Sequence, residues 1–304
     1  MPKRAYILPA AELGHRRWDA CVQQAANGLI YAQSAFLNAM APNWHGVVID
    51  DYAAVMAIPW KMKFGFRYAY MPPFMQQLGL MGNYDESDLK AVLRTIPDFI
   101  SYGDIHFNFS NTDVITHGAE AKTNLVIDLQ LPYGQIQAGY RNDLKENIRK
   151  AETNRLQYIT DTQIETAVSQ YESNYAVRMP QTKQDDYNRF QALCIALSEN
   201  AACFTRSVTD EQNNLLAIGL FLKDDKRIYN LMNTTLAEGR NLEANHFLLD
   251  KVIREFSQQS LLFDFEGSSL PGIKAFYQQF GAKEQPYFHY HHNSLPWWLR
   301  LWKR

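Results

Sequence analysis

The feature that most constrains the fold of this chain is the stretch Leu261–Ala282, LLFDFEGSSLPGIKAFYQQFGA. Its first six residues alternate between an apolar set and a set that ends in Asp264 and Glu266, and this period of two predicts a strand. Glycine, serine and proline then interrupt the strand, and a short amphipathic helix closed by Gly281 follows. Carboxylates at the carboxyl end of a strand, before a turn and a helix, lie where open α/β sheets bind ligands. Asp264 and Glu266 are therefore candidate site residues; the alternative is that they cap the turn and pair with nearby cations.

The order of predicted elements repeats in the two halves of the chain. The strand FRYAYM, a glycine-containing loop, the helix DLKAVLRTI and the strand DIHFNFS parallel the strand RIYNLM, a glycine-containing loop, the helix ANHFLLDKVI and the strand LLFDFEGS. The two halves share negligible sequence identity, so the match is one of element order and strand endings. It predicts an α/β fold with mixed α+β sheets and a duplicated unit, divided near Pro132 into subdomains 1–132 and 133–304 with a cleft between them.

Several segments of the chain resemble a known family. FDFEGS, PGI and FYQQFGA are similar to the C-terminal signature of the FemABX-type peptidyltransferases and of their BioF2-like acetyltransferase relatives. FYQQFGA also resembles the last helix of single GNAT acetyltransferases, with Ala282 at the place of the usual phenylalanine. The region from YAQSAFLNAM to PPFMQQLGL looks like the family's first half, so the resemblance covers most of the chain.

This resemblance implies two tandem GNAT-like subdomains and an N-acyltransferase activity. The enzyme would move an acyl or aminoacyl group from acyl-CoA or aminoacyl-tRNA to an amine, in a cell-wall (peptidoglycan) precursor or an amino sugar. The alternative is a catalytically inactive double-GNAT module that binds a phosphorylated glycan or peptide.

Aminolysis of a thioester or ester needs a base for the amine, donors for the oxyanion and an acid for the leaving group. Glu266 is the preferred base, because Gly267 beside it lets a ligand or another backbone come close. Partial desolvation by the neighbouring aromatic residues should raise the pKa of the Glu266 carboxylate. Asp264, deeper and flanked by two phenylalanines, is the second candidate for the base, but it is better placed to orient a neighbouring group than to meet the substrate. Tyr277 matches the general-acid tyrosine of many GNAT enzymes, although a tyrosine on an amphipathic helix also packs in cores. Ser268, in the same turn, is a substrate-binding candidate.

A helix predicted over Gln135–Asn154 carries a row of cations. They recur every four residues, with one more beside them: Arg141, Lys145, Arg149 and Lys150. The stretch NIRKAETN resembles the family's equivalent helix, in which basic residues face the substrate cleft and its phosphates. The row suits an extended phosphate or an anionic peptide; the alternative is a solvated face whose charge neighbouring glutamates offset.

The pyrophosphate-binding loop of GNAT proteins is missing at the place where it should stand. The segment TTLAEGRNLEANHF has only Gly239 before its helix, with Arg240 next to it. Backbone N–H groups at a helix N-terminus could still hold an anion there. The choice between acyl-CoA and aminoacyl-tRNA as donor therefore stays open.

Composition excludes several other classes of protein. A hydrophobic content of 46% over 304 residues is enough for sizeable cores. A net charge of −2 argues against a general nucleic-acid-coating protein, so no DNA partner is expected, although it does not exclude a local basic groove. Three separated cysteines, no signal-peptide pattern and no apolar run of about 20 residues predict a cytoplasmic protein. His289 and His291 share one face of a predicted strand, but no third ligand has recognisable spacing, so no metal is expected.

The last ten residues, LPWWLRLWKR, contain three tryptophans and three cations. This composition suits a weak contact with a membrane surface. The alternative, favoured by the family's architecture, is that the tail 293–304 packs back on the first subdomain.

Overall fold

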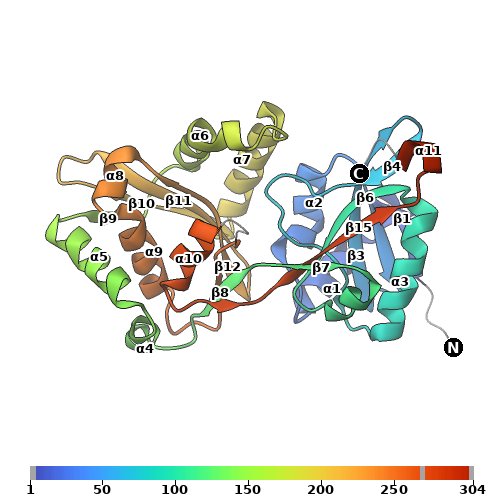
Figure 1. Cartoon of the computed structure of the whole chain (residues 1–304), viewed down its shortest axis with the longest axis horizontal. Coiled ribbons are helices and arrows are strands. Elements are labelled where there is room, and N and C mark those ends of the chain that lie inside the picture. Colours follow the sequence, from blue (N-terminus) through green and yellow to red (C-terminus); the bar gives the residue numbers. More distant parts are fainter. Residues whose placement is uncertain (1–4, 268–270, 301–304) are drawn as a thin grey trace. The chain divides into compact units, whose positions relative to one another are not determined.

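The structure is a computed structural model that describes residues 5–267 and 271–300. The chain divides into two compact units. Unit 1 comprises Met1–Lys122 and Pro286–Arg304, and unit 2 comprises Thr123–Gln285. Each unit is built on one mixed β-sheet (Figure 1).

The sheet of unit 1 has the order β1-β2-β3-β4-β6-β15-β7, with β5 beside β3. The elements of this unit are β1 Ala5–Pro9, η1 Ala10–Glu12, α1 His15–Gln24, η2 Ile30–Ala32, α2 Ser34–Met40, β2 Trp44–Ile49, β3 Ala54–Lys63, β4 Phe66–Ala69, β5 Met81–Gly82, α3 Glu86–Phe99, β6 Tyr102–Phe107, η3 Thr112–His117, β7 Glu120–Lys122, β15 Tyr287–Asn293 and α11 Trp297–Arg300.

Helix α3 shows how local sequence produces an element of unit 1. A capping box starts it, since the Asp85 side chain accepts from the Asp88 N–H and the Asp88 side chain accepts from the Asp85 N–H. Its apolar residues recur at helical spacing and join the buried core against the sheet: Leu89, Val92, Leu93 and Ile96.

The sheet of unit 2 has the order β14-β8-β13-β12-β11-β10-β9. Its elements are β8 Leu125–Asp128, α4 Tyr133–Ala138, α5 Asn142–Thr153, β9 Gln157–Ile159, α6 Ile164–Tyr175, η4 Ala176–Arg178, α7 Gln184–Ser198, β10 Cys203–Thr209, β11 Leu215–Lys223, β12 Arg227–Thr235, α8 Ala237–Asn241, α9 Ala244–Glu255, β13 Leu262–Asp264, α10 Pro271–Gln278 and β14 Lys283–Glu284. Helices α5 and α9 pack together over one face of this sheet, while α6 and α7 pack on β10–β12 with buried side chains of their own (Figure 1).

The two sheets repeat one pattern of strand directions, which confirms the duplicated α/β fold. In unit 1, β1 to β4 are antiparallel neighbours, and β6 joins β4 in parallel after α3. In unit 2, β9 to β12 are antiparallel neighbours, and β13 joins β12 in parallel after α9. One antiparallel strand then lies between the last two strands of each sheet, β15 between β6 and β7 and β8 between β13 and β14.

The sheets that β8 and β15 join determine where the chain passes from one unit to the other. Strand β8 follows β7 of unit 1 in sequence but pairs in unit 2, and β15 follows β14 of unit 2 but pairs in unit 1. A single boundary at residue 132 is expected from the sequence, whereas the units divide after Lys122 and again after Gln285. The pairing of β8 and β15 is the physical reason for this difference.

The helix predicted over residues 135–154 is two helices in the structure. It is interrupted between α4 and α5, where the Arg141 N–H donates to the Gln279 carbonyl instead of continuing a helix. None of the helices in the described ranges is long and apolar enough to cross a membrane.

Candidate functional site

The candidate site of unit 2 begins where β12 and β13 stop pairing. The two strands are paired at only three positions, from Arg227 opposite Leu262 to Tyr229 opposite Asp264. Strand β13 ends there, whereas β12 continues to Thr235. Beyond Tyr229 this edge of β12 has no β13 partner within the described chain, and a cavity of about 570 Å³ adjoins it. Backbone N–H and C=O groups along such an edge can bind an extended ligand.

A β-bulge lies in the part of β12 that lines this cavity. Leu220 pairs with Met232 and Phe221 pairs with Asn230, so Leu231 is the extra residue. Bulges redirect side chains and are frequent beside active sites.

Two amide side chains in the lining have polar atoms without a partner. Asn230 is only 3% exposed, and its Nδ2 finds no hydrogen-bond acceptor among the described residues. The Oδ1 of Asn245, at the start of α9, finds no donor in the same set. Buried amides usually have partners, so these two atoms are available to a polar ligand.

Glu266 lies at the edge of this cavity, in the turn that follows β13. The strand was expected to continue to Glu266, but it ends at Asp264, because Glu266 adopts a left-handed φ of +53°. Its N–H donates to Asp264 Oδ1 at 3.0 Å, and the next N–H, of Gly267, donates to Asn124 Oδ1 at 2.7 Å. A Cβ on Gly267 would come within 2.7 Å of the Asn124 Cα, so this position requires glycine. Positive φ at a non-glycine residue is held only by such surrounding contacts, and it clusters at functional sites.

Asp264 has a different position from Glu266. It is fully buried and does not line the cavity. Its carboxylate accepts from Asn124 Nδ2 at 2.9 Å and from Arg227 Nη1 at 2.8 Å, in addition to the Glu266 N–H. Arg227 Nη2 donates in turn to Gln285 Oε1 at 2.7 Å. Asp264 therefore holds the turn that presents Glu266 to the cavity.

Tyr277 reaches the same cavity from α10. Its ring stacks on Phe265 with centroids 4.4 Å apart. Burial raises the pKa of the Tyr277 hydroxyl, and the nearby Tyr171, Tyr175 and Glu266 raise it further. The hydroxyl is therefore protonated at neutral pH and can donate a proton or a hydrogen bond.

Helix α6 and the turn after it supply a wall that was not predicted to be functional. Tyr171 and Tyr175, one turn apart and with rings 5.0 Å apart, line the cavity together with the exposed Arg178. Burial raises the pKa of Tyr171 to about 12. In the sequence, the spacing of the two tyrosines indicates only an apolar helix face, and their hydroxyl groups are the one signal of a polar role.

Comparison with known proteins establishes the fold of the chain. No family model matches the sequence, and no curated protein matches it significantly. The crystal structure of FemX matches with a TM-score of 0.67 and 12% identity, over 95% of this chain and 98% of that one. A tandem GNAT protein from the clavulanic acid biosynthesis pathway matches with a TM-score of 0.52 and 12% identity, over 96% of this chain and 99% of that one. The chain has the tandem GNAT fold. The C-terminal domain of a putative lysylphosphatidylglycerol synthetase from Agrobacterium fabrum matches with a TM-score of 0.55 and 13% identity, over 93% of both chains.

The cations predicted to form one row lie in three places on the second GNAT unit. Lys145 and Arg149 line a separate cavity of about 360 Å³, together with Arg254 from α9, which the sequence did not suggest. Arg141 precedes α5 and is not on its ridge, and Lys150 pairs with Glu243 at 3.3 Å. No described residue lines both cavities.

The segment that replaces the GNAT pyrophosphate loop forms the short helix α8. Gly239 lies within it, where a Cβ would be 2.1 Å from the Leu216 carbonyl oxygen, so this glycine allows α8 to pack on β11. Arg240 is exposed beside it. The residue before α9 is Glu243, whose carboxylate lies 3.0 Å from His246 Nδ1. A carboxylate therefore already adjoins the N-terminus of α9. Ser268, the remaining predicted residue, lies outside the described residues.

The paired histidines of unit 1 have an acidic partner. His289 Nε2 and His291 Nδ1 both bond to Asp104 Oδ1, at 2.9 and 2.8 Å. Within residues 5–267 and 271–300, no group of three or more histidine, cysteine or acidic side chains is placed to hold a metal ion.

Proposed function

We propose that this protein is an N-acyltransferase that uses the cavity of unit 2 to move an acyl or aminoacyl group from an activated donor to an amine. The observation that carries the proposal is the meeting of Glu266 and Tyr277 at a cavity adjoining the part of β12 that β13 leaves unpaired. The similarity in fold to FemX and to a tandem GNAT protein supports the same class of reaction.

The geometry suggests a role for each group. The donor's carbonyl oxygen would accept from N–H groups on the β12 edge, which would stabilise the negative charge that develops during attack. Glu266 would take one proton from the ammonium form of the amine, and the neutral amine nitrogen would then form a bond to the carbonyl carbon. As the bond to the leaving sulfur or oxygen breaks, Tyr277 would give that atom a proton and regain one from the nitrogen of the intermediate. The products are an amide, a free thiol or hydroxyl group and one proton released to solvent.

The class of donor follows in part from the charges at the site. Among the described residues that line this cavity, Arg178 is the one cation, and Gly239 and Arg240 do not belong to that lining. We therefore propose that the donor is held mainly through its acyl arm along β12, which both acyl-CoA and aminoacyl-tRNA could provide. The acceptor we propose is an amine on a cell-wall precursor or an amino sugar. The three cysteines are free thiols, which supports a cytoplasmic setting.

The test begins by identifying a substrate pair. Native mass spectrometry of freshly purified protein would identify a bound donor, and turnover would then be measured with that donor and a panel of amines. Glu266→Gln should lower turnover by ~10²–10⁴-fold with little change in stability, as expected for loss of a general base. Glu238→Gln, at an exposed position on α8, is the matched control and should keep full turnover.

A second comparison separates the base from the acid. Tyr277→Phe keeps the ring that stacks on Phe265 and removes only the hydroxyl group. A thioester with a more acidic leaving thiol should restore turnover to the Phe variant but not to Glu266→Gln, since only the former lacks a proton donor. Near-normal turnover in Glu266→Gln would make Glu266 a turn residue, and no turnover with any donor would favour a binding module.

A further inference from the structure

The tip of the β3–β4 hairpin in unit 1 has an unusual residue for its conformation. Phe64 and Gly65 form a two-residue turn in which both φ angles are positive, +51° and +80°. Such turns favour asparagine followed by glycine, and a bulky aromatic residue with positive φ is a rare exception. Phe64 is also 84% exposed. Both the backbone and the exposed ring are unfavourable in the isolated unit, which suggests that this ring is held in position to contact something else.

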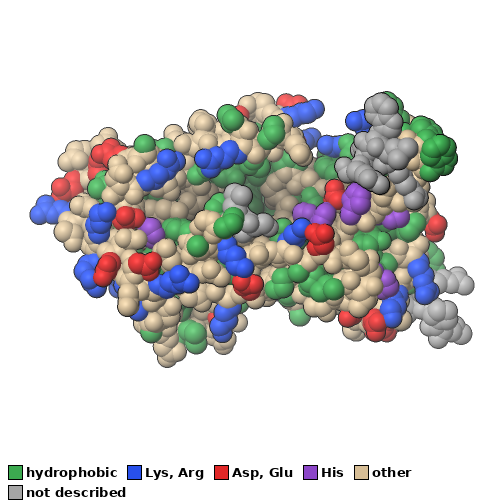
Figure 2. Space-filling view, viewed as in Figure 1, with side chains coloured by type: hydrophobic (Ala, Val, Ile, Leu, Met, Phe, Trp, Pro, Cys, Tyr) green, Lys and Arg blue, Asp and Glu red, His purple; other side chains and the backbone are tan. Residues whose placement is uncertain are grey.

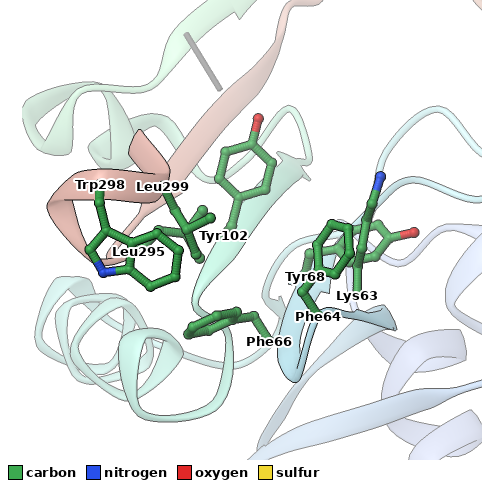
Figure 3. Close-up of a pocket in the computed structure, with 8 residues that line it drawn as sticks. All are labelled: Lys63, Phe64, Phe66, Tyr68, Tyr102, Leu295, Trp298 and Leu299. Atoms are coloured by element: carbon green, nitrogen blue, oxygen red, sulfur yellow. The ribbon is translucent and has the colours of Figure 1, made fainter. Parts of the chain in front are cut away.

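Beside the hairpin lies an apolar cavity of about 390 Å³. Phe64, Phe66 and Tyr68 of the hairpin line one side, and Trp298 and Leu299 of α11 line the other (Figure 3). Its volume is in the range of small-molecule sites, which are mostly apolar with a few polar groups. Among the described residues that line it, Lys63 is the only charged side chain.

The same two segments expose large hydrophobic side chains to solvent. Met62 and Phe64 are 54% and 84% exposed on the hairpin, and Trp297 and Trp298 are 76% and 53% exposed on α11. Hydrophobic side chains gather over α11 in Figure 2. Contiguous exposed apolar surface of this kind marks an interaction site.

The charge of these segments identifies the kind of partner. Residues 60–68 contain three cations and no acidic residue, and so do residues 294–304, although the whole chain has a net charge of −2. Lys61 lies over the Tyr70 ring at 4.1 Å and Arg67 over the Trp60 ring at 5.3 Å. Neither of these two cations, nor Lys63, makes an ion pair within the part of the chain that the structure describes. Aromatic residues surrounded by lysine and arginine are typical of protein surfaces that bind anionic membranes.

We propose that the hairpin tip and α11 form a docking surface for an anionic lipid bilayer. Phe64 and the two α11 tryptophans enter the interface, the hairpin cations meet the lipid phosphates, and one acyl chain of a lipid enters the apolar cavity. This inference does not depend on the proposed reaction in unit 2. In this proposal, unit 1 holds the protein at a membrane surface.

Vesicle flotation tests the proposal directly. The full chain should float with vesicles of phosphatidylcholine and phosphatidylglycerol, and much less with vesicles of phosphatidylcholine alone. Phe64→Asn should lower this partitioning by about 10- to 100-fold, the effect of withdrawing one large apolar side chain from lipid. Because asparagine favours the conformation at this position, the melting temperature of the variant should stay the same or rise. Lys61→Gln and Lys63→Gln should each cost about fivefold, only with anionic vesicles.

The control is Ile115→Asn, which changes a side chain that is 50% exposed elsewhere in unit 1. It should leave flotation unchanged. Lipids brominated in their acyl chains should quench tryptophan fluorescence in the bound wild type, and quenching should be lost in Trp297→Tyr with Trp298→Tyr.

Three outcomes would overturn the proposal. The first is failure of the wild type to float with anionic vesicles, and the second is a loss of flotation in Ile115→Asn as large as that in Phe64→Asn. Sedimentation velocity without vesicles provides the third: self-association that Phe64→Asn abolishes would assign this surface to a second copy of the chain.

Discussion

Breaking the buried ion pair behind the cavity should destabilise unit 2 strongly. The side chains of Arg227 and Asp264 are 3% and 1% exposed, and Nη1 lies 2.8 Å from Oδ2. The substitution Asp264→Asn keeps an oxygen that can still accept from Asn124 and from the Glu266 N–H, but it removes the negative charge. Arg227 is then a buried cation without its anion, and this arrangement costs about 3–5 kcal/mol of unfolding free energy.

The assay must report on unit 2 separately from unit 1. Every described tryptophan belongs to unit 1, so tryptophan fluorescence is a poor probe of this substitution. Hydrogen exchange of peptides from β12 and β13, measured with circular dichroism in urea, follows the affected strands instead. Glu211→Gln is the control, because the Arg155–Glu211 pair is 77% and 50% exposed and such pairs contribute below about 1 kcal/mol.

A double substitution checks the cause of the loss. Arg227→Met together with Asp264→Leu removes both charges, so most of the lost stability should return. If Asp264→Asn lowered stability by less than about 1 kcal/mol and still abolished turnover, the reasoning would be refuted. Asp264 would then act in the chemistry and would not simply hold the turn.

Three further predictions concern other parts of unit 2. Arg149→Glu should weaken binding of inorganic phosphate or a phosphorylated ligand by about 1.5–3 kcal/mol in calorimetry, whereas Arg155→Glu should not; equal binding by both would leave Arg149 a solvated residue. Gly239→Ala should destabilise by about 1–3 kcal/mol through its contact with backbone, and Gly134→Ala, with nothing within 4 Å, should be neutral or stabilising in urea unfolding. Burial raises the pKa of Asp250 in the folded protein. The folded state therefore holds this proton more tightly than the unfolded chain does, and the free energy of unfolding of the wild type falls as pH rises through the folded-state pKa. Asp250→Asn has no such proton to lose, so it should gain stability relative to the wild type between acidic and neutral pH.

Much of the fold could be predicted because its signals are local. The helix predicted for the segment DLKAVLRTI is present as α3, since its capping box and apolar spacing both lie within the helix and its N-cap. The repeated strand–helix–strand order is also confirmed, because its signals too lie within each element. The sequence does not predict that β8 joins the sheet of unit 2 or that β15 joins the sheet of unit 1, because neither strand's own sequence specifies its partner sheet.

The residues that line the cavity of unit 2 could likewise be predicted only where their signal is local in the sequence. Glu266 and Tyr277 were proposed from a pattern within one stretch of sequence, and the structure brings both to one cavity. Tyr171 and Tyr175 lie about a hundred residues earlier, on a helix whose spacing indicates only burial. Their part in the lining depends on how α6 packs on β12, which is a tertiary contact that the helix sequence does not encode.

The different roles proposed for the two carboxylates depend on a residue that no sequence pattern singles out. Asn124, one residue before β8, donates to Asp264 and accepts from the Gly267 N–H, and its carbonyl accepts from the Gln285 N–H at 3.0 Å. It reaches these groups because β8 pairs with both β13 and β14. Strand β8 thus places Asn124 where it holds the turn in which Glu266 takes its left-handed conformation. Asp264 and Glu266 are two residues apart, yet this long-range contact helps to bury one in an ion pair and to leave the other at the cavity.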